Sequence, residues 1–125
     1  MRSAEQEGGI GSMDERVETV GDVVKVSITG HLVASCSEDF KTHMFRQLSE
    51  AKRVLLDLTG MVHVDSSGLG ALVSLQQWLG DRGGALKMAC LQPRAKVVFD
   101  ITRVDRIFAI YDTVEAALAA FEAEK

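Results

Sequence analysis

Residues 53–80, RVLLDLTGMVHVDSSGLGALVSLQQWLG, decide the fold of this chain. The run Val54–Leu58 is almost continuously apolar, which is typical of a strand buried on both faces. A short link at Met61–Val64 leads into Asp65-Ser66-Ser67-Gly68, and apolar residues at helical spacing follow, so we predict a helix over residues 66–79. Such a junction places hydroxyl groups beside the unpaired N–H groups of a helix start, where negative charge is favoured.

Composition limits the class of protein. With 125 residues, of which 46% are hydrophobic, the chain can form one domain with its own core. Its 18 acidic and 14 basic residues give a net charge of -4, which does not favour nucleic acid as a partner. No apolar run approaches the ~20 residues needed to cross a bilayer, and the N-terminus lacks the apolar segment of a signal peptide, so we expect a cytoplasmic protein without membrane insertion.

Metal and cofactor sites have little support in the sequence. Cys36 and Cys90 are far apart, and their spacing indicates neither a metal site nor a disulfide framework. The three histidines also lack the spacing of metal ligands: His31, His43 and His63. We therefore expect no cofactor and no metal.

The N-terminal half predicts a hairpin followed by a helix. Residues 1–13 are expected to form a flexible tail, with Met13 an alternative start, and residues 14–125 the domain. Two β-prone runs, 16–20 and 23–28, flank Gly21-Asp22, which is typical of a hairpin turn. Gly30 is expected to end the second strand.

The expected helix follows a linker over residues 31–34. Ser35 and Glu38 have the spacing of a capping box for a helix that reaches about residue 51. Its apolar positions recur at helical spacing: Phe40, Met44, Leu48 and Ala51.

The C-terminal half alternates strands and helices. Residues 85–91 and 107–111 are expected to be strands. Between them, Pro93 suits the first turn of a short helix patterned by Val97, Val98 and Ile101. Asp112 and Glu115 predict a capping box for a last helix. The whole order indicates an α/β fold, with a mixed sheet of about five strands and about four helices packed mainly on one side.

Ser66 is the candidate functional centre, and its chemistry has several interpretations. By composition alone, Asp65 and Ser66 are simply good helix-start residues. A hydrolase nucleophile requires Gly-x-Ser-x-Gly, but Val64 occupies the first glycine position, and His63 and Asp65 share one extended segment. The run Gly68-Leu69-Gly70 is a weak signal for phosphate or nucleotide binding. The remaining interpretation is an exposed serine that a kinase phosphorylates.

Two long runs carry a resemblance to a known family. LLDLTGMVHVDSSGLGALVSL (55–75) and ACLQPRAKVVFDITRVDRIFAIYDTVEAAL (89–118) resemble STAS domains, most closely the bacterial anti-sigma factor antagonists. The resemblance extends over roughly residues 17–121, and its most specific part is Asp-Ser-Ser-Gly-Leu-Gly at 65–70.

The resemblance implies a regulatory binding protein rather than an enzyme. In this family the unphosphorylated antagonist binds a serine-kinase anti-sigma factor, the kinase phosphorylates the first serine of the motif, and a PP2C-type phosphatase restores it. The matching acceptor here is Ser66. The matching partner-binding residues are Asp65, Ser67, Gly68 and Leu69.

One position departs from the family pattern. Val33 stands where the antagonists commonly have an acidic residue, and Ala34-Ser35-Cys36 differs from their usual helix start. The resemblance therefore also admits an alternative, a STAS accessory subunit of a transporter or a signalling scaffold.

Overall fold

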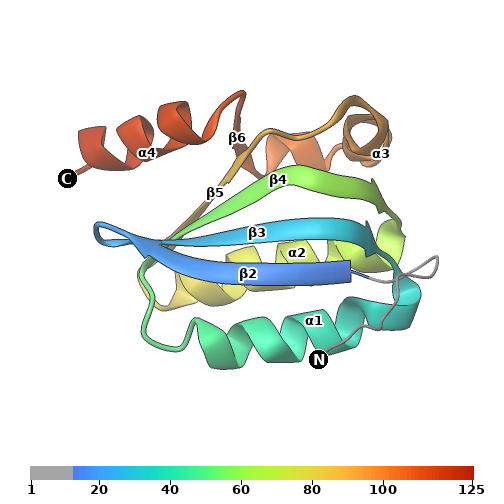
Figure 1. The fold of residues 1–125 in the computed structure, drawn as a ribbon, viewed down its shortest axis with the longest axis horizontal. Helices are drawn as coiled ribbons and strands as arrows, with labels where there is room; N and C mark the ends of the chain where they lie inside the picture. The colour runs from blue at the N-terminus through green and yellow to red at the C-terminus, as the bar shows by residue number, and fades with distance from the viewer. Residues whose placement is uncertain (1–12) are drawn as a thin grey trace.

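The computed structural model describes residues 13–125 and contains five strands, four α-helices and one 3-10 helix within that range (Figure 1). The expected tail over residues 1–13 lies outside this range except for Met13, which begins the first strand. None of the helices in the described range is long and apolar enough to cross a membrane. In chain order the elements are β2 (Met13–Val20), β3 (Val23–Leu32), α1 (Ala34–Gln47), β4 (Arg53–Val64), α2 (Ser66–Asp81), β5 (Ala85–Ala89), α3 (Pro93–Thr102), η1 (Val104–Arg106), β6 (Ala109–Tyr111) and α4 (Val114–Ala123).

The strands form one mixed sheet in the order β2-β3-β4-β5-β6. β2 and β3 are antiparallel and meet at a two-residue turn, where Gly21 has a φ of +64°. The other neighbouring strands are parallel. This confirms the predicted α/β class, the hairpin and the mixed sheet.

β4 is the central strand and is buried on both faces. Val54 and Leu56 pack in the main core with residues of α1 and α2, whereas Leu55 packs in a second core with Ala117 and Phe121 of α4. Because neighbouring side chains of a strand point to opposite faces, α4 covers the face opposite α1 and α2. Figure 1 shows α1 and α2 alongside one another, and α4 apart from them. Helices therefore lie mainly on one side, as predicted.

Several strand boundaries differ from the prediction. β3 continues past Gly30 to Leu32, and β4 continues past Leu58 to Val64, so the expected linker at 31–34 and link at 61–64 are largely strand. The extensions pair with each other in parallel across register shifts, and Gly60 lets them meet because a Cβ there would lie 2.3 Å from the Thr29 methyl group. The last two strands are shorter than expected, because Cys90 has a left-handed backbone and η1 precedes β6.

Two predicted capping boxes are wrong. The N-cap of α1 is Val33, which provides no side-chain hydrogen bond, and Ser35 lies inside the first turn. The N-cap of α4 is Thr113, whose hydroxyl accepts a hydrogen bond from the Ala116 N–H at 3.0 Å. Helix α1 also ends at Gln47 rather than near residue 51, although its four predicted apolar positions are all buried.

Helix α3 begins at Pro93 as expected, but the face that packs on the core is not the one that carries most of the expected apolar positions. Its buried residues are Ala95 and Phe99, and the Phe99 ring lies 6.0 Å from that of Phe108. Val97 is 55% exposed and Ile101 is 75% exposed. The apolar pattern predicted a helix correctly, but most of that pattern does not face the core.

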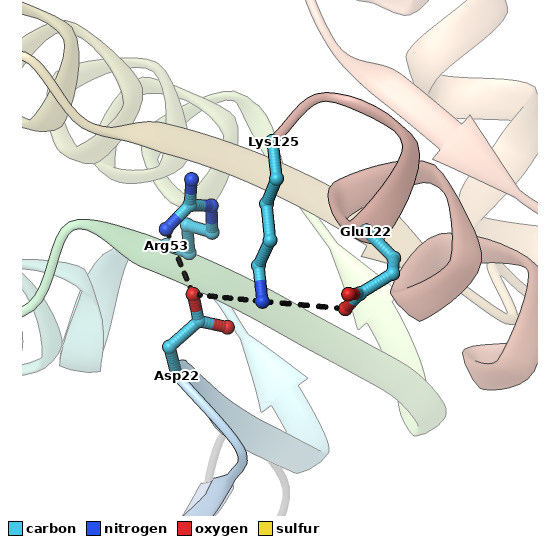
Figure 2. Close-up of polar contacts among 4 residues, drawn as sticks. All are labelled: Asp22, Arg53, Glu122 and Lys125. Carbon is cyan, nitrogen blue, oxygen red and sulfur yellow. Dashed lines mark hydrogen bonds and ion pairs between the residues drawn. The ribbon is translucent and has the colours of Figure 1, made fainter.

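The end of α4 lies beside the β2–β3 turn (Figure 2). The Asp22 carboxylate lies 2.9 Å from the Arg53 guanidinium and 3.4 Å from Lys125 Nζ, which is 3.3 Å from Glu122 Oε1. Hydrogen bonds with Glu122 and then Asp22 raise the pKa of Lys125 above its ordinary value. Because these side chains are partly exposed, the network orients the terminus more than it stabilises the fold.

Gln76 is a polar residue within the apolar stripe of α2. Its Nε2 donates a hydrogen bond to the Ile107 carbonyl at 2.6 Å, and this bond joins α2 to the segment that precedes β6. The Ile107 carbonyl lies before β6 and accepts this hydrogen bond from Gln76, which accounts for a polar side chain at this position.

Replacing Gln76 should therefore affect stability more than replacing its neighbour. We expect Gln76→Leu to lower the free energy of unfolding by about 1 kcal/mol, because the Ile107 carbonyl loses its donor. Gln77→Leu, at an exposed position of the same helix, should change it by less than about 0.5 kcal/mol. Urea unfolding of both variants measures the difference, and equal values would contradict a structural role for the Gln76 side chain.

Candidate functional site

Ser66 and Ser67 lie at the start of α2, directly after the carboxyl end of β4. Both residues are exposed, and the helix behind them is anchored by buried leucines. The first N–H groups of a helix have no partner within the helix, so this end carries partial positive charge. The Ser66 hydroxyl is thus presented to solvent on a rigid support, as predicted.

Asp65 joins the starts of two helices. Its Oδ1 accepts a hydrogen bond from the Gly68 N–H of α2 at 2.9 Å, and its Oδ2 accepts one from the Ala34 N–H of α1 at 3.0 Å. The sequence predicted the first bond but not the second. The sequence feature that indicates the second bond is Val33. An apolar N-cap residue cannot accept a hydrogen bond from the first N–H groups of its helix, so an acceptor elsewhere in the chain is needed.

Gly68 packs against the protein's own backbone. A Cβ at this position would lie 2.1 Å from the Leu32 carbonyl oxygen and 2.9 Å from the Val64 side chain. The chain that approaches Gly68 is therefore the end of β3. Gly70 is different, because a Cβ there would meet nothing within 4 Å.

The predicted partner-binding residues divide into two groups. Asp65 is partly exposed and Ser67 is exposed, whereas Gly68 is buried and Leu69 is only 3% exposed. Gly68 and Leu69 thus support the exposed turn from beneath. Direct contact of any of these residues with a partner stays a prediction.

The geometry does not assemble a Ser-His-Asp relay. Asp65 accepts hydrogen bonds from two backbone N–H groups, and none of the histidines within residues 13–125 is hydrogen-bonded to its carboxylate. His63 instead faces His31 on the neighbouring strand, with ring centroids 6.3 Å apart. Within residues 13–125 no three His, Cys, Asp or Glu side chains converge as a metal site would require.

The model of the STAS domain family matches residues 15–117, which include most of the β2–β3 hairpin, the serine turn and the start of α4. The chain belongs to the STAS family. A Thermotoga neapolitana protein, assigned by its name as an anti-sigma factor antagonist homologue, is 31% identical over 101 residues, which are 79% of this chain and 89% of that protein.

Solved structures share the fold. A Thermotoga maritima protein, assigned by its name to the same class, is 25% identical with a TM-score of 0.80, over 85% of this chain and 92% of its own. The Bacillus antagonist SpoIIAA in its unphosphorylated form matches with a TM-score of 0.75, over 88% of this chain and 97% of its own. Its phosphorylated form matches with a TM-score of 0.65, over 86% of this chain and 99% of its own. At 17% identity in both cases, SpoIIAA shows the STAS fold alone.

The two glycines of the STAS motif should respond oppositely to alanine. Gly68→Ala should lower the free energy of unfolding by about 2–3 kcal/mol, because the methyl group overlaps the Leu32 carbonyl. Gly70→Ala should raise it by roughly 0.5–1 kcal/mol, because the site is open and alanine favours helix. Thermal and urea unfolding measure both, and equal effects would contradict the close approach at Gly68.

Because Asp65 caps two helices, it should contribute more to the free energy of unfolding than an ordinary exposed acidic residue. Asp65→Ala removes two charge-assisted hydrogen bonds and should cost about 2 kcal/mol, whereas Asp65→Asn keeps one acceptor oxygen and should cost about half as much. Asp39→Ala, at an exposed position of α1, is the matched control. Hydrogen exchange of the Ala34 and Gly68 amides reports on both helix starts, and loss of protection at Gly68 alone would contradict the bridge.

Proposed function

We propose that this STAS domain is an anti-sigma factor antagonist that binds a serine-kinase anti-sigma factor while Ser66 is unphosphorylated. Phosphorylation of Ser66 releases the partner, and a PP2C-type phosphatase restores binding. The observation that carries the proposal is the exposed Ser66 hydroxyl at the first position of α2. On this proposal the chain is a substrate and a regulator of transcription in the cytoplasm, and it catalyses no reaction.

The domain itself can accept a phosphate on Ser66 without unfolding. A phosphoryl group adds about -1.5 to -2 charges at neutral pH. At the N-terminus of α2 this charge faces the positive end of the helix dipole, which favours it. The serine also lies outside the core, so no apolar packing has to be broken.

The same phosphate on Ser66 has a different effect on the binding of a partner protein. In an interface that covers Ser66, the phosphate must lose water while it lies next to the Asp65 carboxylate in the chain. A loss of about 4 kcal/mol there weakens binding roughly a thousandfold. Phosphorylation therefore acts as a local electrostatic switch on the partner, while the fold of the domain changes little.

Asp65 and Ser67 form the proposed contact surface together with Ser66. Gly68 and Leu69 take part by fixing the position of this turn against β3 and the core. Val33 lies next to the surface because its neighbour Ala34 donates to Asp65. An apolar residue at this position favours a kinase partner whose facing surface is less basic than usual for the family.

The phosphorylation site is tested with the serine-kinase anti-sigma factor encoded in the same genome and ATP. Mass spectrometry should find one phosphate on Ser66, none on Ser66→Ala, and normal modification of Ser67→Ala. Binding to the kinase, measured by calorimetry, should fall by at least about a hundredfold for Ser66→Asp, with a melting temperature close to that of the wild type.

Other outcomes would redirect the proposal. Full modification of Ser66→Ala would place the phosphate elsewhere and reject the site. Equal affinity of the wild type and Ser66→Asp for the kinase would contradict the proposed switch. Stable recovery of a membrane transport protein or a scaffold, with no kinase, would instead support the role of STAS accessory subunit.

A further inference from the structure

A hollow of about 580 Å³ lies at the carboxyl ends of β5 and β6. Its wall includes Cys90, which follows β5, Tyr111, which ends β6, and Lys96 of α3. Ligand pockets in proteins commonly have volumes of roughly 300–1,000 Å³, and in open α/β sheets they lie beyond the carboxyl ends of the strands. The hollow therefore has the size and the place in the fold that suit a small organic molecule.

Hydrogen bonds hold one part of this wall in place. Cys90 has a left-handed backbone with a φ of 63°, which is unusual for a residue other than glycine. Its N–H donates to the Tyr111 carbonyl at 3.0 Å, and its carbonyl accepts from Gln92 Nε2 at 2.8 Å. Residues in such a conformation cluster at ligand sites, where the surrounding structure fixes them. This part of the hollow is preformed, so a ligand does not have to order it.

Another part of the wall is apolar. It contains Phe108, which is only 6% exposed, together with the partly buried Leu91, Ile110 and Tyr111. Two of these four side chains are aromatic, and aromatic rings attract cations as well as apolar groups. The wall can therefore hold the apolar body of a ligand.

The charged side chains of the wall are mainly acidic. Lys96 and Asp100 form an ion pair at 3.0 Å and offset one another. Asp105 of η1 and Asp112, which follows β6, also line the hollow. Within residues 13–125, neither of these two carboxylates forms an ion pair. Both are therefore available to a positive group of a ligand.

The positive groups near the hollow do not cancel this charge. The starts of α3 and α4 border it, and each contributes about half a positive charge. Since the wall has one lysine and three aspartates, its net charge stays at about -1. Lys87, near the Tyr111 ring, is already paired with Glu124 at 2.7 Å. Three exposed arginines lie outside the wall, where water screens their charges: Arg94, Arg103 and Arg106.

We propose that this hollow binds a small organic cation, a primary amine with an aromatic or apolar body. The ammonium group faces Asp105 and Asp112, and the body lies against Phe108 and Tyr111. An anion of the same shape would meet two unpaired carboxylates, and a neutral molecule would gain no attraction between charges. Ser66 does not line the hollow, so this inference does not depend on the proposed function.

NMR titration of the full chain with benzylamine, benzyl alcohol and benzoate tests the proposal, because the three share one ring and differ in charge. Benzylamine should shift the amides of Cys90, Gln92 and Tyr111, with a dissociation constant of about 1 mM, as suits so small a ligand. Benzyl alcohol should bind at least about threefold more weakly, and benzoate at least about tenfold more weakly. Added salt should weaken the binding of benzylamine but not that of benzyl alcohol.

Two variants test the carboxylates. Asp105→Asn and Asp112→Asn keep the shape of the wall and each remove one negative charge. Each should weaken benzylamine binding by at least about threefold and leave benzyl alcohol binding unchanged. Asp81→Asn is the matched control, because Asp81 is exposed at the end of α2 and lies outside the wall. Circular dichroism checks that each variant folds.

A third variant separates this site from the serine turn. Ser66→Ala should bind benzylamine with the affinity of the wild type, because Ser66 lies outside the wall. Loss of phosphorylation in this variant with unchanged amine binding would show that the two sites act separately.

Three results would overturn the proposal. One is the absence of amide shifts in the wall at about ten times the expected dissociation constant of benzylamine. Another is benzoate binding as tight as that of benzylamine, which would assign the hollow to anions. The third is benzylamine binding that both asparagine variants leave unchanged, which would place the amine elsewhere.

Discussion

The carboxylate of Asp65 connects the parts of this STAS domain that matter for its proposed function. It lies at the carboxyl end of the buried strand β4 and accepts hydrogen bonds from the first turns of both α1 and α2. Two helix starts side by side place two sets of positive partial charge near one another. A single anion between them offsets this, and it fixes the backbone from which the Ser66 side chain projects.

The same geometry explains why a modification at Ser66 can be local. The turn is held on one side by Asp65 and on the other by Gly68 against the Leu32 carbonyl, so the backbone has little freedom to rearrange. A new dianion next to Asp65 changes the potential in front of the turn rather than its shape. Because Asp65 also accepts a hydrogen bond from Ala34, this change reaches the first turn of α1, next to its N-cap residue Val33.

Much of the fold could be predicted because it depends on short-range patterns. The apolar run of β4, the glycine turn of the hairpin and the polar start of α2 each specify local structure. What could not be predicted depends on contacts between distant segments. β3 and β4 extend because their ends pair with each other. Helix α1 needs no capping residue of its own because Asp65, which is 31 positions away in sequence, accepts the hydrogen bond from the Ala34 N–H. Helix α3 is the remaining case: its periodicity is real, but the sequence alone does not say which face packs on Phe108.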